Sequence, residues 1–406
     1  MINRSTIIQF FLIIGLQFPT LFRKSESILH FPSTPVWERY IYANKCRSHR
    51  VHSTHFHNKN NKAREMLGFV FGFLLGMYFW RCWTWPRVRS VKPGLNKNVI
   101  LPHVEELEIH HNTMSSNSQK VRVCLGETGL KHRQIHHVLP TSGSWSTKCA
   151  DFLSKVNPAG TVPVLVHNGH PIYESHEQIL YIDQVLMPGG PRLTPTDPKL
   201  KALMDKWVES GAMIMPELQG DPWAGLSKRV GNLLPIMTLP IFAAKYATEF
   251  TIWNLLESAS MIPLVSDRKI IMMHFVFKIL GVEAFDKVGK MKELLSFGRK
   301  AFELHFSMLT KDLEESGGPY ICGTQFTLAD CSLVPVLERM TYAKWWTKSL
   351  KSKYPVVYKY WEAIQKRDGY KASKPNKEMH DKLIQLGHVI DEWKTEHKWF
   401  NAFYEN

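Results

Sequence analysis

A proline stands at the entrance to a β-branched run in Gly160-Thr161-Val162-Pro163-Val164-Leu165, where a strand would miss one backbone donor. A cis Val162-Pro163 bond is the expected solution, because it turns the chain and presents the Val162 backbone to a ligand. Further on, Ser175 and Gln178 form a predicted capping box, so a helix begins near the same place. A serine-rich segment, residues 115–118, opens another helix. Two helix N-termini beside one proline favour carboxylates and ionised thiols, because unpaired N–H groups and helix dipoles attract negative charge.

The elements that must hold these groups lie between Leu107 and Leu186. Alternating apolar residues predict a strand at Leu107 to Ile109, and a polar loop at 112–118 leads into an amphipathic helix. The remaining predicted elements are a strand at Ile135 to Leu139, a helix around Phe152, a hairpin closed by Asn168-Gly169, and a helix from Ser175. The predicted order is βαβαββα.

The chain from Asp197 onward has the periodicity of helices. Pro198 marks one helix start, and Lys287 to Glu315 predicts a long amphipathic helix that ends at Gly317-Gly318. Thr327-Leu328-Ala329-Asp330 is a capping box opening a helix that runs to Met340. One further helix is predicted in the basic tail, at Met379 to Trp393.

The secondary structure of the region from Gly211 to Leu295 is the hardest to predict from the sequence. Pro235 and Pro240 interrupt the apolar run Val230 to Tyr246, which indicates a buried helix pair or a surface hydrophobic loop. The run Ile270 to Leu280 fits a core helix better than a membrane-facing one.

Length and composition predict a globular protein of two or three domains, since the 406 residues are 44% hydrophobic. The six cysteines show neither CxxC nor Cys/His metal spacing, so they indicate a reducing compartment and no metal site: Cys46, Cys82, Cys124, Cys149, Cys322 and Cys331. Of the net charge of +15, about +12 falls within residues 1–103. Because this excess flanks apolar segments, we interpret it as a membrane signal and expect no nucleic-acid partner.

The first 103 residues are predicted to anchor the chain to a membrane. The run 7–22 is a candidate signal sequence or first anchor, and 66–85 is the predicted transmembrane helix, with Trp83 and Trp85 at the headgroup level. Small residues at Gly68, Gly72 and Gly76 are either a dimer-forming stripe or simply frequent membrane-helix glycines. The flanking charges favour a cytosolic folded domain. The histidine-rich stretch between these runs fits a linker better than a metal site.

These motifs together resemble the glutathione transferase superfamily over about residues 104 to 375. The residues that carry the resemblance are Ser115 to Arg122, Asn157-Pro158, Val162 to Leu165, Glu174-Ser175 and Phe326 to Asp330. Ser118 to Arg122, Pro191-Arg192-Leu193 and Ile321-Cys322-Gly323 are similar to the ganglioside-induced differentiation-associated protein family. The resemblance implies a thioredoxin-like domain at 104–190, a helical domain at 191–385 with a long central insertion, and a tail at 386–406.

The resemblance also implies a glutathione site. Ser115, with Ser116 as the second candidate, would stabilise the thiolate, unless these serines only cap the helix. Val162 beside cis Pro163 would pair with the cysteinyl backbone, while Glu174 and Ser175 would hold the γ-glutamyl end. A purely architectural role for Pro163 is the alternative. No cysteine lies in the loop, so conjugation or isomerisation is favoured over thiol exchange.

Two functions are therefore open. The first is a membrane-anchored glutathione transferase that conjugates glutathione to a hydrophobic electrophile, as a candidate homodimer and without a metal. The second is a catalytically weak or inactive relative that acts in mitochondrial or other organelle membrane dynamics through protein or membrane contacts. The predicted location is a single-pass membrane protein, with the mitochondrial outer membrane as a candidate.

Overall fold

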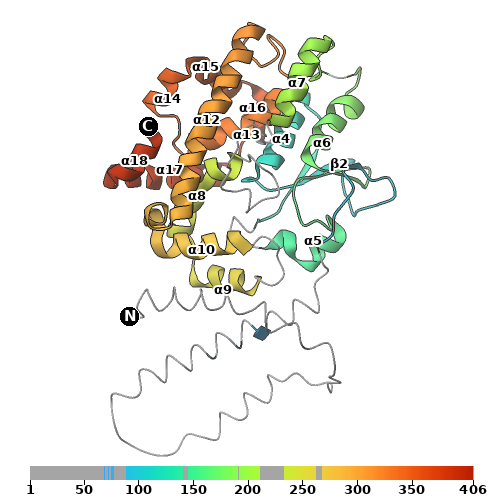
Figure 1. Ribbon diagram of the computed structural model, residues 1–406. Coiled ribbons are helices and arrows are strands. Elements are labelled where there is room, and N and C mark those ends of the chain that lie inside the picture. The colour runs from blue at the N-terminus through green and yellow to red at the C-terminus, as the bar shows by residue number, and fades with distance from the viewer. Residues whose placement is uncertain are drawn as a thin grey trace, which may run out of the picture. The chain divides into compact units, whose positions relative to one another are not determined.

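The computed structural model describes residues 88–139, 145–190, 192–210, 233–261 and 268–405, together with Gly68, Gly72, Leu75 and Gly76 (Figure 1). The described part begins with a five-stranded sheet in the order β1-β5-β4-β2-β3. Its strands are β1 (Gly94–Leu95), β2 (Leu107–His111), β3 (Arg133–His136), β4 (Val164–His167) and β5 (His170–Tyr173). β2 and β3 run parallel, whereas β4 and β5 are antiparallel to their neighbours. β2 is buried along its whole length, which agrees with its interior place between β4 and β3.

Three helices accompany the sheet: α4 (Ser116–Thr128), α5 (Ala150–Lys155) and α6 (Ser175–Tyr181). Their order with β2 to β5 is the predicted βαβαββα, and the hairpin turns at Asn168 and Gly169, both with positive φ. The strand after α4 begins two residues earlier than predicted and ends at His136. The edge strand β1 was not predicted from the sequence; it has only two residues, Gly94 and Leu95, which pair with β5.

The rest of the described chain is helical. Its helices are α7 (Pro198–Ser210), α8 (Leu233–Thr248), α9 (Ile252–Ser260), α10 (Arg268–Leu280), α11 (Ala284–Lys287), α12 (Gly289–Ser316), α13 (Leu328–Tyr342), α14 (Lys348–Lys353), α15 (Pro355–Gln365), α16 (Asp368–Ser373), α17 (Lys377–Glu396) and α18 (Lys398–Glu405). α13 opens with the predicted capping box, in which Thr327 and Asp330 bond each other's backbone. The predicted fold class, a thioredoxin-like α/β part followed by a helical part, is confirmed.

The two parts share one apolar core. Ile109 of the sheet and Val121 of α4 belong to the same buried cluster as Trp207 of α7 and Leu333 of α13. α4 packs against both α13 and α16, and Figure 1 shows these three helices close together. The helical part therefore rests directly on α4, the helix that follows the loop at 112–118, which we call the serine loop.

The structure corrects the expectation for the apolar run that contains Pro240. A single helix, α8, continues through this proline instead of breaking into two. Leu239, Ile241 and Ala243 around it are fully buried, so their packing offsets the hydrogen bond that proline removes. Residues 211–232 and 262–267 of the predicted insertion lie outside the described residues.

The prediction of a single-pass membrane location, mitochondrial outer membrane included, is wrong. Within the described ranges, no helix has both the length and the apolar character that crossing a bilayer requires. A span takes about 20 mostly apolar residues. α8 is apolar but has only 16 residues, and the 28-residue α12 carries many charged residues. The segments 7–22 and 66–85 lie outside the described residues, apart from Gly68, Gly72, Leu75 and Gly76.

Candidate functional site

The register of β2 and β4 brings the predicted proline beside the serine loop. His110, near the carboxyl end of β2, pairs with Val164, the first residue of β4. Pro163 therefore lies beside the point where the chain leaves β2 for Ser115. The Val162-Pro163 bond is cis, as predicted, and both residues are buried.

The register of β4 and β5 brings the third segment to the same edge. Leu165 pairs with Ile172, so the residues that follow β5, Glu174 and Ser175, lie beside Pro163. The predicted binding residues thus gather at one end of three neighbouring strands. This geometry follows from strand pairing alone, because antiparallel neighbours place the start of one strand beside the end of the next.

Ser115 is the N-cap of α4, with extended backbone angles of φ −76° and ψ 120°. Its Oγ accepts a hydrogen bond from the Ser118 N–H at 3.2 Å. A hydroxyl that accepts one bond keeps its proton for donation, so capping and thiolate stabilisation are compatible. Ser116 begins the helix, and both serines are half-buried.

Glu174 is held in an unusual backbone conformation at the start of α6. Its φ is +68° and ψ is 124°, an arrangement that side-chain-bearing residues rarely adopt. Its side chain is exposed and makes no cap hydrogen bond, whereas Ser175, the first residue of the helix, is buried. Strained residues of this kind concentrate at functional sites.

The predicted capping box of Ser175 with Gln178 is wrong. The Gln178 side chain is fully buried, and its Nε2 donates to the Pro163 carbonyl at 3.0 Å and the Ile172 carbonyl at 2.8 Å. Both hydrogen bonds are buried, so the amide satisfies carbonyl groups that water does not reach. Gln178 therefore holds the backbone at Val162-Pro163, which we call the proline turn. Its position in the sequence did not reveal this role.

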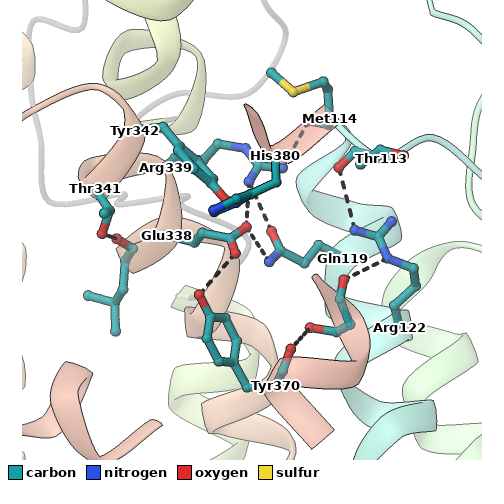
Figure 2. Close-up of polar contacts among 12 residues, drawn as sticks. Thr113, Met114, Gln119, Arg122, Glu338, Arg339, Thr341, Tyr342, Tyr370 and His380 are labelled. Atoms are coloured by element: carbon teal, nitrogen blue, oxygen red, sulfur yellow. Dashed lines mark hydrogen bonds and ion pairs between the residues drawn. The ribbon is translucent and has the colours of Figure 1, made fainter. Parts of the chain in front are cut away.

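Two buried arginines hold the backbone of the serine loop (Figure 2). Arg122 of α4 donates to the carbonyls of Asn112 at 3.2 Å and Thr113 at 3.4 Å. Arg339, in the last turn of α13, donates to the carbonyl of Met114 at 3.0 Å. Three successive carbonyls before Ser115 are thus bound by guanidinium groups from both parts of the protein.

The charge of Arg339 is balanced by its neighbour Glu338, at 3.0 Å, and both side chains are only 2% exposed. Glu338 also accepts hydrogen bonds from the Gln119 amide and the Tyr370 hydroxyl. Among the described residues, no carboxylate forms an ion pair with Arg122, and burial lowers its pKa to about 10 although the Glu338 charge opposes this shift. The region behind Ser115 therefore carries net positive charge, which favours an anion in front of it.

Histidines on β2 and just after β3 pack beside this loop. His110 and His137 stack, with 2.9 Å between Nδ1 and Nε2, and His111 Nδ1 lies 3.1 Å from the Arg122 guanidinium. Burial lowers the pKa of His111 to about 3 and that of His137 to about 4. Among the described residues, no three metal-ligating side chains are grouped so that they could hold an ion.

Lys148 is a further candidate that the sequence analysis missed. Its ammonium donates to the carbonyl of Ala159 at 3.2 Å, in the turn before Val162. Burial lowers its pKa, and no carboxylate of the described residues lies near enough to raise it. A partly buried cation of this kind suits a ligand carboxylate. A single lysine in this part of the sequence carries no recognisable motif.

Cys124, Tyr342 and Trp345 have packing roles in the core. Cys124 is fully buried in α4, with its Sγ 3.9 Å from the Ile179 carbonyl. Trp345 is fully buried against Tyr404, with ring centroids 4.3 Å apart, and Tyr342 is 4% exposed. None of these side chains is placed at the edge where Pro163 and Glu174 meet.

The fold and this edge define a class of protein: a thioredoxin-like domain with a cis-proline, followed by an all-helical domain. Residues 114–185 match the family model described as the N-terminal domain of glutathione S-transferase, and residues 283–363 match that of its C-terminal domain. The two matched regions belong to the glutathione S-transferase superfamily.

Individual relatives are distant. The chain is 21% identical over 269 residues to glutathione S-transferase TCHQD of Arabidopsis thaliana, covering 65% of this chain and 88% of that protein. It is 24% identical over 291 residues to human ganglioside-induced differentiation-associated protein 1-like 1, covering 66% and 73%. A solved glutathione S-transferase of Methylobacillus flagellatus with glutathione bound is 18% identical, at a TM-score of 0.38, and covers 66% and 99%. The predicted family resemblance is confirmed.

Proposed function

We propose that this protein binds glutathione at the edge formed by the serine loop, Pro163 and the start of α6, and transfers it to an electrophilic small molecule. The observation that carries the proposal is the strand register, which gathers three separate segments at one end of β2, β4 and β5. The proposal is independent of any membrane location.

The tripeptide would lie along this edge in an extended conformation. Val162 offers its backbone N–H and C=O to the cysteinyl residue, which would pair with it as an added strand. Ser175 and the start of α6 suit the γ-glutamyl carboxylate, and the exposed carboxylate of Glu174 suits its ammonium. Lys148 would hold the glycyl carboxylate beyond the turn at Ala159.

The reaction needs an ionised thiol, and a free cysteine thiol has a pKa near 8.5. The Ser115 hydroxyl would donate to the sulfur, and Arg122 behind the loop adds positive charge. The sulfur then uses an electron pair to form a carbon–sulfur bond, a leaving group takes the electrons of the broken bond, and the thiol proton goes to solvent. Such charge stabilisation lowers the pKa of the bound thiol.

Calorimetry of the full chain with glutathione tests binding. We expect saturable heat that Glu174→Ala and Ser175→Ala each weaken about tenfold or more, because a hydrogen bond to a charged group contributes about 1.5–3 kcal/mol. Glu362→Ala, an exposed position on α15, is the matched control and should bind as the parent does. Absence of heat at millimolar glutathione would refute the proposal.

A further inference from the structure

A second concave region lies in the helical part, away from the candidate glutathione site. It is a cavity of about 460 Å³ at the end of α13, walled by α14, α15, α17 and α18, which Figure 1 labels. This volume lies within the range of small-molecule sites. None of the residues that line it belongs to the serine loop, the proline turn or α6.

The lining of this cavity is unbalanced in charge. Four lysines line it, namely Lys344, Lys348, Lys351 and Lys394, against two carboxylates, Asp391 and Glu405. Asp391 is shared, since Lys344 Nζ lies 2.8 Å and Lys394 Nζ 4.0 Å from its two oxygens. Two positive charges therefore remain without a carboxylate of the lining.

Two features that lower the stability of the fold place Lys344 at this cavity. Its φ is +61°, in the left-handed region that favours glycine. The Lys344 side chain also passes close to Gly387 of α17. A Cβ on residue 387 would lie only 2.7 Å from Lys344 Cε, so a larger residue there would displace the lysine. A glycine inside a helix and a lysine in a left-handed turn both lower stability, and together they allow the ammonium to reach Asp391.

Lys394 is held in a similar way. It is 17% exposed, its ammonium lies 4.6 Å from the centroid of the Tyr404 ring, and burial lowers its pKa. An ammonium that is partly removed from water gains more from a bound anion than a fully exposed one does.

Aromatic side chains supply the rest of the wall. Trp346 and Tyr358 line the cavity, and their ring centroids are 5.3 Å apart. Trp346 also stacks on Phe306, with ring centroids 5.6 Å apart. Lys351 Nζ lies 4.4 Å from the centroid of Tyr358, so charge and ring surface adjoin. Rings held by such packing suit a planar apolar body, while the ammonium groups suit a multiply charged head.

We propose that this cavity binds an organic phosphate: a phosphate monoester whose organic part contains a planar aromatic ring. A phosphate monoester has a charge of about −1.5 to −2 at neutral pH, which matches the two uncompensated lysine charges. Its three terminal oxygens accept from ammonium groups on several sides. The site is independent of the proposed glutathione chemistry.

Calorimetry of the full chain with adenosine 5′-monophosphate and with phenyl phosphate tests the proposal, with adenosine and inorganic phosphate as partial ligands. We expect at least one of the two esters to bind, each partial ligand to bind about tenfold more weakly or worse, and the ester's affinity to fall as salt is added. Lys351→Met and Lys394→Met should each weaken binding about tenfold or more, while Lys394→Arg retains it. Glutathione should not displace the ester.

Lys382→Met is the matched control. Lys382 lies on α17 as Lys394 does, but it pairs with Glu378 and is not part of the cavity lining, so its loss should leave binding unchanged. Thermal unfolding of each variant verifies that it is folded. The proposal is overturned if neither ester binds at millimolar concentration, if adenosine binds as well as its phosphate, if Lys351→Met and Lys394→Met bind normally, or if glutathione competes.

Discussion

Arg339 Nη2 donates a hydrogen bond to the carbonyl oxygen of Met114 at 3.0 Å, joining the last turn of α13 to the residue before Ser115. The guanidinium is buried and bound on its other side by Glu338 and Gln119. The helical part therefore takes a direct part in fixing the loop from which the thiol would be stabilised (Figure 2).

Replacing Arg339 should cost more stability than removing both members of its ion pair. Arg339→Met leaves the buried Glu338 carboxylate without its cation, which costs about 3–5 kcal/mol, whereas a Glu338→Met, Arg339→Met double variant avoids the unpaired charge. Urea unfolding at neutral pH measures both. Lys366→Met, at an exposed position after α15, should change stability little. Equal losses in the single and double variants would show that the charge pair is not what matters.

Ser115→Ala should lower turnover more than it lowers glutathione affinity. The hydroxyl is expected to bond the ionised sulfur, and a hydrogen bond to a charged group contributes about 1.5–3 kcal/mol, so conjugation to a small electrophile should slow about tenfold to a hundredfold. The pKa of the bound thiol, followed by its ultraviolet absorbance, should rise in the same variant.

Two serines serve as comparisons for this variant. Ser154→Ala removes an exposed hydroxyl that bonds the Ala150 carbonyl within α5, and its turnover should match the parent. Ser116→Ala tests the second candidate at the start of α4. If Ser116→Ala slows turnover and Ser115→Ala does not, the assignment passes to Ser116.

Glu174→Gly should stabilise the fold while weakening glutathione binding. Glycine adopts the φ of +68° without strain, so unfolding in urea should become harder by up to about 1 kcal/mol. The lost carboxylate should raise the dissociation constant for glutathione. Asn168→Gly is the control, since Asn168 also has a positive φ, of 50°, but lies in the hairpin turn. Weakened binding in both variants would contradict the role given to the Glu174 carboxylate.

Acid should weaken the fold through the histidines beside the loop. The folded pKa of His111 is about 3 and that of His137 about 4, below the value of about 6.5 expected when unfolded. The unfolded chain thus binds more protons, so the stability from keeping these rings neutral is complete above pH 6.5 and is lost as pH falls toward 4.

Denaturant unfolding of the parent and of His111→Gln across this range measures the effect. The glutamine takes up no proton, so the parent's stability relative to the variant should fall between pH 7 and pH 4. A difference that stays constant over that range would show that His111 is not the group that titrates.

The sequence determined the elements whose signals are local. The cis-proline, the Asn168-Gly169 turn and the Thr327 capping box each follow from a few adjacent residues, because backbone geometry and nearby hydrogen bonds decide them. The order of strands and helices followed from hydrophobic periodicity. The prediction from Ser175 and Gln178 failed although its pattern was correct, because the Gln178 amide is buried and binds the carbonyl of Pro163 instead.

Tertiary structure alone decided what lies behind and around the site. Arg122 and Arg339 are far apart in the chain, and nothing in either local sequence indicates that both bind the same loop. The close approach of Lys344 to Gly387 likewise arises only because α17 packs beside the end of α13. Hydrogen bonds and charge pairs between distant segments depend on how helices pack, and packing is set by the whole core rather than by any short stretch of residues.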